Sequence, residues 1–186
     1  MRIISGKFKG SKLFIPLDKN TRPLKDMVKE SIFNTLIHSK KFLFDFENTN
    51  ILDLFSGTGS FGLECISRGS TNTIFVENNK DALTILNKNI NKLKIKNKTL
   101  IIEKSVFDFL TNSLNIKKKF DLIFLDPPFS EIKIINLLNI IYDGNILSKN
   151  GIIIMHRHKK SKEIDVNLYK NKIKKLYGLS KIIYLF

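Results

Sequence analysis

Two short stretches of the sequence combine residue types that can bind or activate a ligand. The first is F-S-G-T-G-S-F-G, residues 55–62, which follows the apolar run of residues 50–54. A glycine-rich turn is therefore expected where a buried strand ends and a helix begins. The glycines have the G-x-G-x-x-G spacing that lets a backbone approach a nucleotide closely. This spacing alone fits both NAD and S-adenosylmethionine.

Carboxylates around this turn favour one of the two nucleotides. Glu77 ends the next apolar run, about twenty residues after the turn, where an acid can accept hydrogen bonds from a ribose diol. Asp53 precedes Phe55 by two residues, and its charge would repel a pyrophosphate but attract an ammonium or sulfonium group. S-adenosylmethionine is therefore favoured over NAD. A capping role for Asp53 and a surface position for Glu77 would explain the same residues without any ligand.

The second stretch is Asp126-Pro127-Pro128-Phe129, which follows the apolar run of residues 122–125. Two consecutive prolines fix the backbone and remove two N–H donors, so the loop offers the carboxylate of Asp126 and the carbonyl of Pro127 as acceptors. Acceptors suit an exocyclic amine, whose lone pair is delocalised into a base, and Phe129 can stack on that base. We predict a target pocket for such an amine here.

The elements that must position these loops alternate between strand and helix after the first forty or so residues. Short apolar runs typical of strands buried on both faces are found near residues 51–55, 73–76, 99–103, 122–125, 151–155, 172–177 and 181–185. Helical periodicity covers residues 61–67, 80–93, 106–114 and 132–140. Asn79 is expected to cap the second of these helices. This order predicts an α/β fold with a parallel sheet covered on both faces and ligands at the carboxyl ends of its strands.

The first 45 residues do not follow this order. Residues 2–16 read as two short strands around Lys9-Gly10, and residues 22–37 read as a helix that begins after Pro23. We therefore expect a small β-hairpin and a helix, residues 1–45, as an extension on a main domain formed by residues 46–186.

Composition indicates a basic, cytoplasmic protein with a phosphate-rich partner. The net charge is +15 over 186 residues, and each Lys or Arg placed against a phosphate releases a condensed counterion. Codon usage in an A/T-rich genome would also enrich lysine. No apolar run has the length of a signal peptide or of a membrane span, roughly 20 residues. The single cysteine, Cys65, lies in an apolar helical pattern, so we expect it to be buried in a reducing compartment.

Taken together, the motifs resemble the RsmD family, bacterial 16S rRNA (guanine-N2)-methyltransferases within the class I S-adenosylmethionine-dependent methyltransferases. Residues 126–129 match the D/N-P-P-F/Y/W motif of amino-methylating enzymes. Residues 2–13 are similar to the pattern R-I-I-x-G-x-x-x-G-x-x-L, and residues 22–34 to R-P-T-x-D-x-V-R-E-x-L-F-N. With the Tyr-Gly pair at residues 177–178, the likeness runs through nearly the whole chain.

The resemblance implies a Rossmann-like fold with a seven-stranded, mostly parallel sheet and a C-terminal antiparallel strand. It implies that S-adenosylmethionine is bound by Asp53, Phe55, Gly57, Gly59, Glu77, Ser105 and Val106. It implies that the catalytic residues are Asp126, Pro127, Pro128 and Phe129. The RNA-contacting extension would bind phosphates through Arg22, Lys25 and Lys29.

The sequence departs from the family at several positions. Ser105 stands where relatives usually place Asp or Asn beside the adenine, and Asp108 follows three residues later. Leu24 replaces a usual Thr and Met27 replaces a frequent Arg. His156 stands where the family often has Glu. The histidines are too scattered to form a metal site with Cys65, so no metal is expected.

The resemblance implies methyl transfer from S-adenosylmethionine to the N2 amine of a guanine in 16S rRNA, within a small-subunit particle, by a monomeric cytoplasmic enzyme. A DNA adenine-N6 methyltransferase and a protein glutamine methyltransferase are alternatives, because the D-P-P-F loop can bind any planar amine. The N-terminal pattern argues against both. An NAD-binding oxidoreductase and a non-catalytic nucleic-acid-binding protein are alternatives of other classes.

Overall fold

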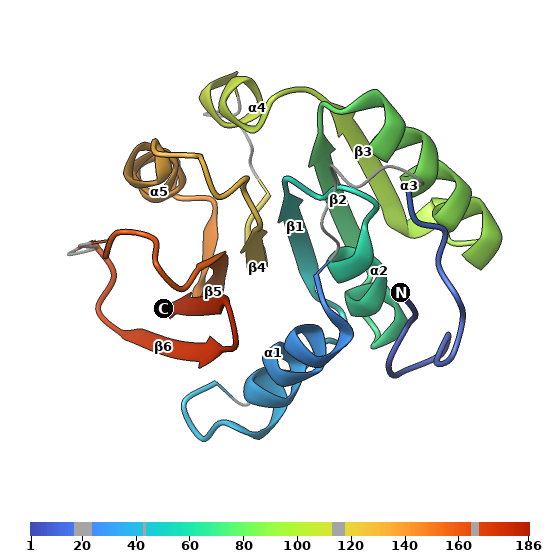
Figure 1. Cartoon of the computed structure of the whole chain (residues 1–186), viewed down its shortest axis with the longest axis horizontal. Helices are drawn as coiled ribbons and strands as arrows, with labels where there is room; N and C mark the ends of the chain where they lie inside the picture. The colour runs from blue at the N-terminus through green and yellow to red at the C-terminus, as the bar shows by residue number, and fades with distance from the viewer. Residues whose placement is uncertain (17–23, 43, 113–117, 165–167) are drawn as a thin grey trace.

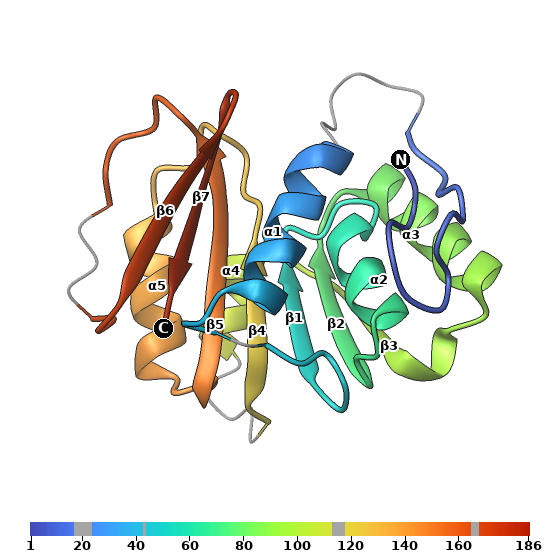
Figure 2. The ribbon, with the colours of Figure 1, turned by 90° about the horizontal axis from the view of Figure 1, so that it is seen from below.

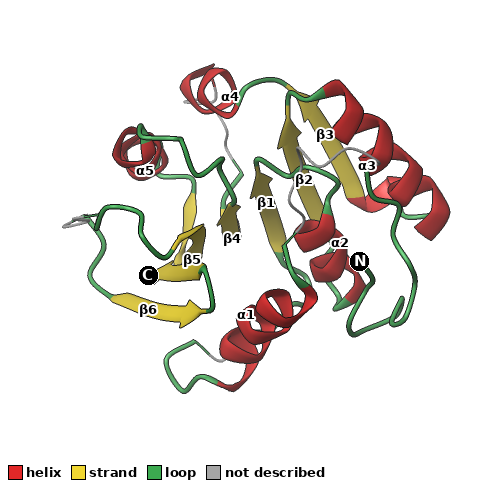
Figure 3. Ribbon diagram, in the orientation of Figure 1, coloured by secondary structure: helices red, strands yellow, loops and turns green. Residues whose placement is uncertain are grey.

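The computed structural model of the chain describes residues 1–16, 24–42, 44–112, 118–164 and 168–186 (Figure 1). Its elements alternate between strand and helix from β1 to β5 (Figure 3). In chain order they are α1 (Asp26–His38), β1 (Asn50–Leu54), α2 (Ser60–Ser67), β2 (Asn72–Glu77), α3 (Lys80–Leu93), the 3-10 helix η1 (Lys96–Lys98), β3 (Thr99–Glu103), α4 (Val106–Asn112), β4 (Phe120–Leu125), α5 (Ile134–Asp143), β5 (Leu147–His158), β6 (Lys172–Tyr177) and β7 (Ser180–Leu185).

The strands form one sheet in the order β3-β2-β1-β4-β5-β7-β6. Strands β1 to β5 pair in parallel, and β7 runs antiparallel to both β5 and β6. The predicted fold, mostly parallel with an antiparallel strand near the C-terminus, is confirmed. The order reverses between β1 and β4, so the carboxyl ends of these two strands open onto the crevice where such sheets bind ligands.

Helices cover both faces of the sheet, as predicted. Figure 2 shows α1 and α2 in front of the sheet and α4 and α5 behind it. The alternation of side chains along a strand explains this division. Leu52 and Leu54 of β1 pack in the cluster that includes α4 and α5, whereas Ile51 packs with α1 and α2. Cys65 of α2 is buried, as expected.

Helix α1 is part of the main hydrophobic core. Its residues Val28, Ile32 and Phe33 are buried in one cluster with Phe61 of α2 and Phe124 of β4. The helix begins at Asp26, later than the sequence pattern indicated, with Lys25 in extended conformation before it. The start predicted at Arg22 and Pro23 lies outside the described residues. The division of the chain at residue 45 stays a prediction.

The N-terminal hairpin is shorter than expected. The two strands predicted within residues 2–16 are reduced to one antiparallel bridge between Arg2 and Lys12. The amide N–H groups of Gly10 and Ile3 donate to the carbonyls of Ile3 and Ser11, at 2.9 and 3.0 Å. Between them the chain turns at Gly6 and Gly10, both with positive φ. A turn of this length leaves few residues on either side to pair.

Element ends differ from the sequence pattern mainly in β5. This strand spans Leu147–His158 instead of residues 151–155, because its pairing with β4 continues past an irregularity between Phe120 and Leu122. Helix α5 begins at Ile134 rather than at Ile132. Asn79 caps α3 as predicted, and its side chain accepts a hydrogen bond from the backbone N–H of Ala82 at 2.9 Å.

Candidate active site at the carboxyl ends of β1 and β4

The glycine turn joins β1 to α2 through residues with left-handed backbone conformation. Phe55, Gly57 and Gly59 have φ values of 58, 54 and 82°. A Cβ atom at Gly59 would lie 2.4 Å from Leu86 of α3, so glycine is required there for close packing. At Gly57 a Cβ atom would meet no described atom within 4 Å. The turn is therefore packed on its inner side and open at Gly57, where a ligand can approach the backbone.

Asp53 lies beneath this turn, in the last part of β1. Its side chain is buried, and Oδ2 accepts a hydrogen bond from the backbone N–H of Gly62 at 2.9 Å. Burial raises the pKa of Asp53 well above its usual value; the Gly62 hydrogen bond opposes this, and the charges of Asp126 and Glu77 add to it. Asp53 therefore holds the start of α2 and lies within electrostatic reach of both other acids.

Glu77, at the end of β2, binds the turn from the side. Its Oε2 accepts from the backbone N–H of Gly57 at 2.7 Å, and its Oε1 accepts from Asn78 and Asn79 at 2.9 and 2.8 Å. An ionised carboxylate has about four acceptor positions. The backbone takes three of them, so Glu77 can accept about one further hydrogen bond, and its contact with a ribose stays a prediction.

Ser105 lies just before α4 and is engaged with Asp108. The Ser105 hydroxyl accepts from the backbone N–H of Asp108 at 3.1 Å and donates to its carboxylate at 2.7 Å. Val106 is buried in the core cluster beneath α4. Strand β3 pairs with β2 so that Glu103 lies beside Glu77. Ser105 and Val106, the residues predicted to lie beside the adenine, thus follow the strand next to β2, but the Ser105 hydroxyl is already engaged with Asp108.

The Asp126-Pro127-Pro128-Phe129 loop lies directly beside the glycine turn. Strands β1 and β4 pair in parallel, with Leu54 opposite Leu125, and the backbone N–H of Asp126 donates to the Leu54 carbonyl at 3.3 Å. Side-chain alternation puts Asp126 on the same face as Phe124, the face covered by α1 and α2. The Phe129 ring is 40 % exposed and so is free to stack on a base.

Arg157 of β5 supports this loop and was missed in the sequence. Its guanidinium donates to the carbonyls of Pro128, Phe129 and Glu131 at 3.1, 3.4 and 2.8 Å. Burial lowers the pKa of Arg157, although Glu131 and Asp126 oppose this. The Pro127 carbonyl receives none of these three hydrogen bonds. The signal in the sequence was a cation that closely follows the apolar run of residues 151–155.

His156, identified in the sequence only as a departure from the family, contacts the predicted catalytic acid. Its Nδ1 lies 2.8 Å from Oδ1 of Asp126, and its Nε2 lies 2.9 Å from Oγ of Ser180 on β7. The edge of the Phe129 ring faces it, with ring centroids 5.6 Å apart. Ser180 carried no signal in the sequence, because only strand pairing brings it to this site.

The three predicted phosphate contacts have different outcomes. Lys29 is 0 % exposed, and its ammonium donates to the Arg2 carbonyl and lies 3.7 Å from Glu64. The prediction that Lys29 binds RNA is therefore wrong: the buried position leaves no path to a phosphate. Lys25 is exposed at the start of α1. Arg22 lies outside the described residues.

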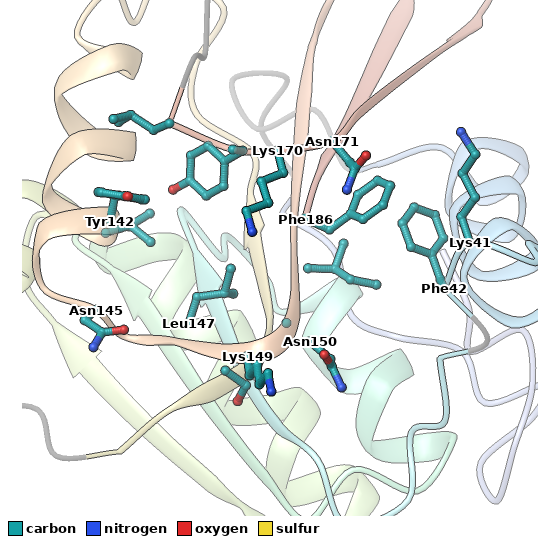
Figure 4. A pocket seen from close by; sticks show the side chains of 16 residues that line it. Lys41, Phe42, Tyr142, Asn145, Leu147, Lys149, Asn150, Lys170, Asn171 and Phe186 are labelled. Atoms are coloured by element: carbon teal, nitrogen blue, oxygen red, sulfur yellow. The ribbon is translucent and has the colours of Figure 1, made fainter.

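A separate hollow of about 780 Å³ opens at the amino end of β5. Figure 4 shows Lys170 extending into it between Tyr142 and Phe186. Its lining includes residues 147–152 of β5, whereas His156 lies at the opposite end of the same strand. This hollow is therefore remote from the glycine turn. Across the described ranges, no group of three or more His, Cys, Asp or Glu could hold a metal ion. No helix in the described part of the chain could span a membrane.

Comparisons with known proteins agree with this geometry. A family model described as conserved hypothetical protein 95 matches residues 1–185. The ribosomal RNA small subunit methyltransferase D of Buchnera aphidicola (subspecies Baizongia pistaciae) is 31% identical over 92% of each chain. Its namesake from Haemophilus influenzae is 33% identical over 86% of this chain and 79% of the relative.

Solved structures show the same architecture. A putative methyltransferase from Escherichia coli superposes with a TM-score of 0.81 at 24% identity and covers 100% of this chain and 97% of its own. A putative methylase from Haemophilus influenzae superposes with a TM-score of 0.75 at 29% identity over 99% of this chain and 97% of its own.

Proposed function

The chain belongs to the RsmD family, the family described as conserved hypothetical protein 95, and on this premise we propose that it methylates the N2 amine of a guanine in 16S rRNA with S-adenosylmethionine as methyl donor. One observation carries the proposal. An acceptor loop and a glycine turn surrounded by carboxylates lie side by side at the ends of the paired strands β1 and β4.

The residues around the turn fit S-adenosylmethionine. The space beside Gly57 admits a ligand to the backbone, and the Ser56 hydroxyl is buried without a hydrogen-bond partner among the described residues. Asp53, Glu77 and Asp126 lie within electrostatic reach of one another, and a group of acids attracts the ammonium and sulfonium groups of this cofactor and repels a pyrophosphate. The carboxylates thus favour S-adenosylmethionine over NAD.

When bound, S-adenosylmethionine supplies a methyl group already activated on a positively charged sulfur. The protein then mainly has to align the target amine, a positioning task that can be worth about 7–11 kcal/mol. Asp126 and the Pro127 carbonyl accept the two amine hydrogens, and Phe129 stacks on the base. As the amine attacks, it gains positive charge, which the Asp126 carboxylate stabilises until a proton leaves.

The base must leave its stack to reach this loop, at a cost of about a few kcal/mol. Residues 1–45 would offset this cost by holding the RNA backbone through exposed cations such as Arg2, Lys7, Lys9 and Lys25. The substrate is proposed to be 16S rRNA within a small-subunit particle, modified by a monomeric enzyme in the cytoplasm without a metal ion.

The test is methyl transfer from labelled S-adenosylmethionine to small subunits from cells that lack the gene, to naked 16S rRNA and to DNA. We expect label on guanine N2 of the rRNA. Asp126→Ala should lower kcat by at least about a hundredfold, the usual size for a group that stabilises transition-state charge. Asp143→Ala, at an exposed acid at the end of α5, is the matched control and should leave kcat unchanged.

Three outcomes would contradict the proposal. Label on adenine of DNA would identify the DNA methyltransferase instead. Calorimetric binding of NAD in place of S-adenosylmethionine would favour an oxidoreductase. Label that is undiminished by Asp126→Ala would remove the D-P-P-F loop from the chemistry.

A further inference from the structure

We infer that His156 is a positioning residue for Asp126: its imidazole fixes the rotation of the carboxylate so that Oδ2 faces the target amine. The inference rests on the proposed function, because the amine is the group that Oδ2 would receive. It assigns a role to β5 and β7, two strands that contribute no residue to the predicted catalytic set.

Strand pairing brings the two side chains together. Strands β4 and β5 pair in parallel with Leu125 opposite Met155. Asp126 follows Leu125 and His156 follows Met155, so these two residues are also neighbours. Both lie on the face that α1 and α2 cover, because they continue the alternation of Phe124 and Ile154. The 2.8 Å contact between Nδ1 and Oδ1 follows from this register.

Asp126 determines which nitrogen of the ring carries the proton, and Ser180 contacts the other nitrogen. Strand β7 runs antiparallel to β5 with Ile182 opposite His156, so Ser180 is the diagonal neighbour on the same face. An ionised carboxylate can only accept hydrogen bonds, so Nδ1 must donate to Asp126. In the neutral ring Nε2 is then an acceptor, and it receives the Ser180 hydroxyl at 2.9 Å.

This chain of bonds leaves one oxygen of Asp126 for the substrate. The Asp126 side chain is 23% exposed, whereas that of His156 is 10% exposed, so the imidazole is enclosed and the carboxylate still reaches solvent. No described residue donates to Oδ2. A carboxylate held at Oδ1 cannot turn toward solvent, and the loss of such alignment can cost about a hundredfold in rate.

The imidazole of His156 contacts Asp126 through one ring nitrogen and Ser180 through the other. The charged and titratable neighbours are Asp126 just after β4, Arg157 and His158 on β5, and Lys181 on β7. Arg157 is turned to the loop carbonyls and Lys181 donates to the Ser161 carbonyl, so neither competes for Asp126.

The first experiment needs no substrate. The chain has three histidines, so two-bond ¹H–¹⁵N spectra of labelled protein, recorded at about pH 8 where free histidine is neutral, can resolve each ring. We expect the Nδ1–H tautomer for His156. Asp126→Ala should shift the population toward Nε2–H, whereas Ser180→Ala, which keeps the Asp126 acceptor, should leave Nδ1–H the main tautomer. An Nε2–H tautomer in the native protein would overturn the inference.

The second experiment compares four variants in the methyl-transfer assay. His156→Asn can place its amide N–H where Nδ1 lies, whereas the longer amide of His156→Gln reaches the position of Nε2. His156→Phe keeps the ring and removes both bonds. We expect kcat to fall about a hundredfold in His156→Phe and His156→Gln and about tenfold or less in His156→Asn, with KM for rRNA and for S-adenosylmethionine unchanged. Ser180→Ala should lower kcat about threefold to tenfold.

The outcomes separate this inference from the proposed function. Equal activity of the Asn and Gln variants, a kcat of His156→Phe within twofold of wild type, or a change in KM alone would each overturn the positioning role. Thermal melting and S-adenosylmethionine affinity verify that the variants fold. If wild-type protein methylates no rRNA, the proposed function fails, while the tautomer measurement still decides whether His156 holds Asp126.

Discussion

At the scale of single residues, the site is costly to the fold. Asp53 is a buried acid with one hydrogen bond from the residues that the structure describes, and Phe55 adopts a left-handed conformation without being glycine. Such features cost free energy of folding and persist where function requires them. The charge of Asp53 and the open space at Gly57 can each be tested by one substitution with a matched control.

Asp53→Asn should stabilise the protein at neutral pH. Burial raises the pKa of Asp53 in the folded state, so the folded state holds this proton more tightly than the unfolded state does. The stability that this tighter proton binding provides is complete below the pKa of Asp53 in the unfolded chain, about 3.9. It is lost as the pH rises through the pKa of Asp53 in the folded protein. Asn keeps an acceptor for Gly62 without the charge.

We expect urea unfolding at about pH 7.5 to give Asp53→Asn about 1 kcal/mol more stability than wild type, with the difference disappearing toward about pH 4. Binding of S-adenosylmethionine should weaken about tenfold, since the cation loses a nearby opposite charge. The exposed control Asp143→Asn should change neither quantity. Lower stability of Asp53→Asn than of wild type at neutral pH would contradict the claim that the buried carboxylate of Asp53 destabilises the folded protein.

Gly57→Ala should separate backbone strain from ligand contact. Gly57 and Gly178 have φ values of 54 and 59°, and at neither position would a Cβ atom meet a described atom within 4 Å. Both alanine variants should therefore lose about 1–2 kcal/mol of stability from the left-handed backbone alone. Only Gly57→Ala should also weaken S-adenosylmethionine binding, which calorimetry would measure. Equal affinities in the two variants would mean that the ligand does not approach Gly57.

At the scale of elements, one buried acid joins the N-terminal segment to the main fold. Glu64 of α2 accepts from the backbone N–H groups of Ile4 and Ser5 at 2.7 and 2.9 Å and from Nε of Arg68 at 2.9 Å. Lys29 of α1 lies 3.7 Å away. Lys29, which the sequence suggested as a contact to RNA, thus holds α1 against α2.

Glu64→Gln should destabilise the protein strongly. Burial lowers the pKa of Lys29 and Glu64 opposes this, so without the carboxylate the buried ammonium loses its main partner. We expect a loss of about 3–5 kcal/mol in urea unfolding. Glu30→Gln, at an exposed acid on α1, should change stability by less than about 0.5 kcal/mol. A loss below about 1 kcal/mol for Glu64→Gln would show that this cluster does not hold the two helices together.

At the scale of the whole molecule, charge and shape define the surface that RNA meets. The net charge of +15 is distributed over many lysines, but the crevice opens only at the carboxyl ends of the strands. Helix α1 begins on that side, because Lys29 in its first turns also donates to Ser60 at the start of α2. Lys25 therefore lies near the crevice, whereas Lys96 precedes β3 at the opposite end of the sheet.

Lys25→Ala should weaken rRNA binding more than Lys96→Ala. Each lysine is exposed, so neither substitution should alter folding. Both variants lose one positive charge, so a difference in their rRNA affinity reports the position of the lysine. If Lys25 contacts one phosphate, the slope of log K against log salt should become shallower by about 0.7. Filter binding at several KCl concentrations measures both slopes. Identical slopes for the two variants would argue that binding follows total charge rather than this surface.

The sequence by itself predicted the order of elements and the two loops that matter most. Buried parallel strands are continuous apolar runs, and a glycine turn or a Pro-Pro loop has a local chemical signature, so residues 55–62 and 126–129 could be recognised without a structure. Ends of elements were less accurate, as in β5, because pairing with β4 and β7 extends that strand beyond its apolar centre.

Tertiary structure alone decided what surrounds these loops. Asp126, His156 and Ser180 are separated by 30 and 24 residues and meet through the register of β4, β5 and β7. Burial shows that Lys29 pairs with Glu64 and does not contact RNA. The sequence pattern of a helix does not show which of its cations will pair with a buried acid. A local pattern specifies a loop because its conformation depends on its own residues, whereas a contact across strands depends on how separate segments pack.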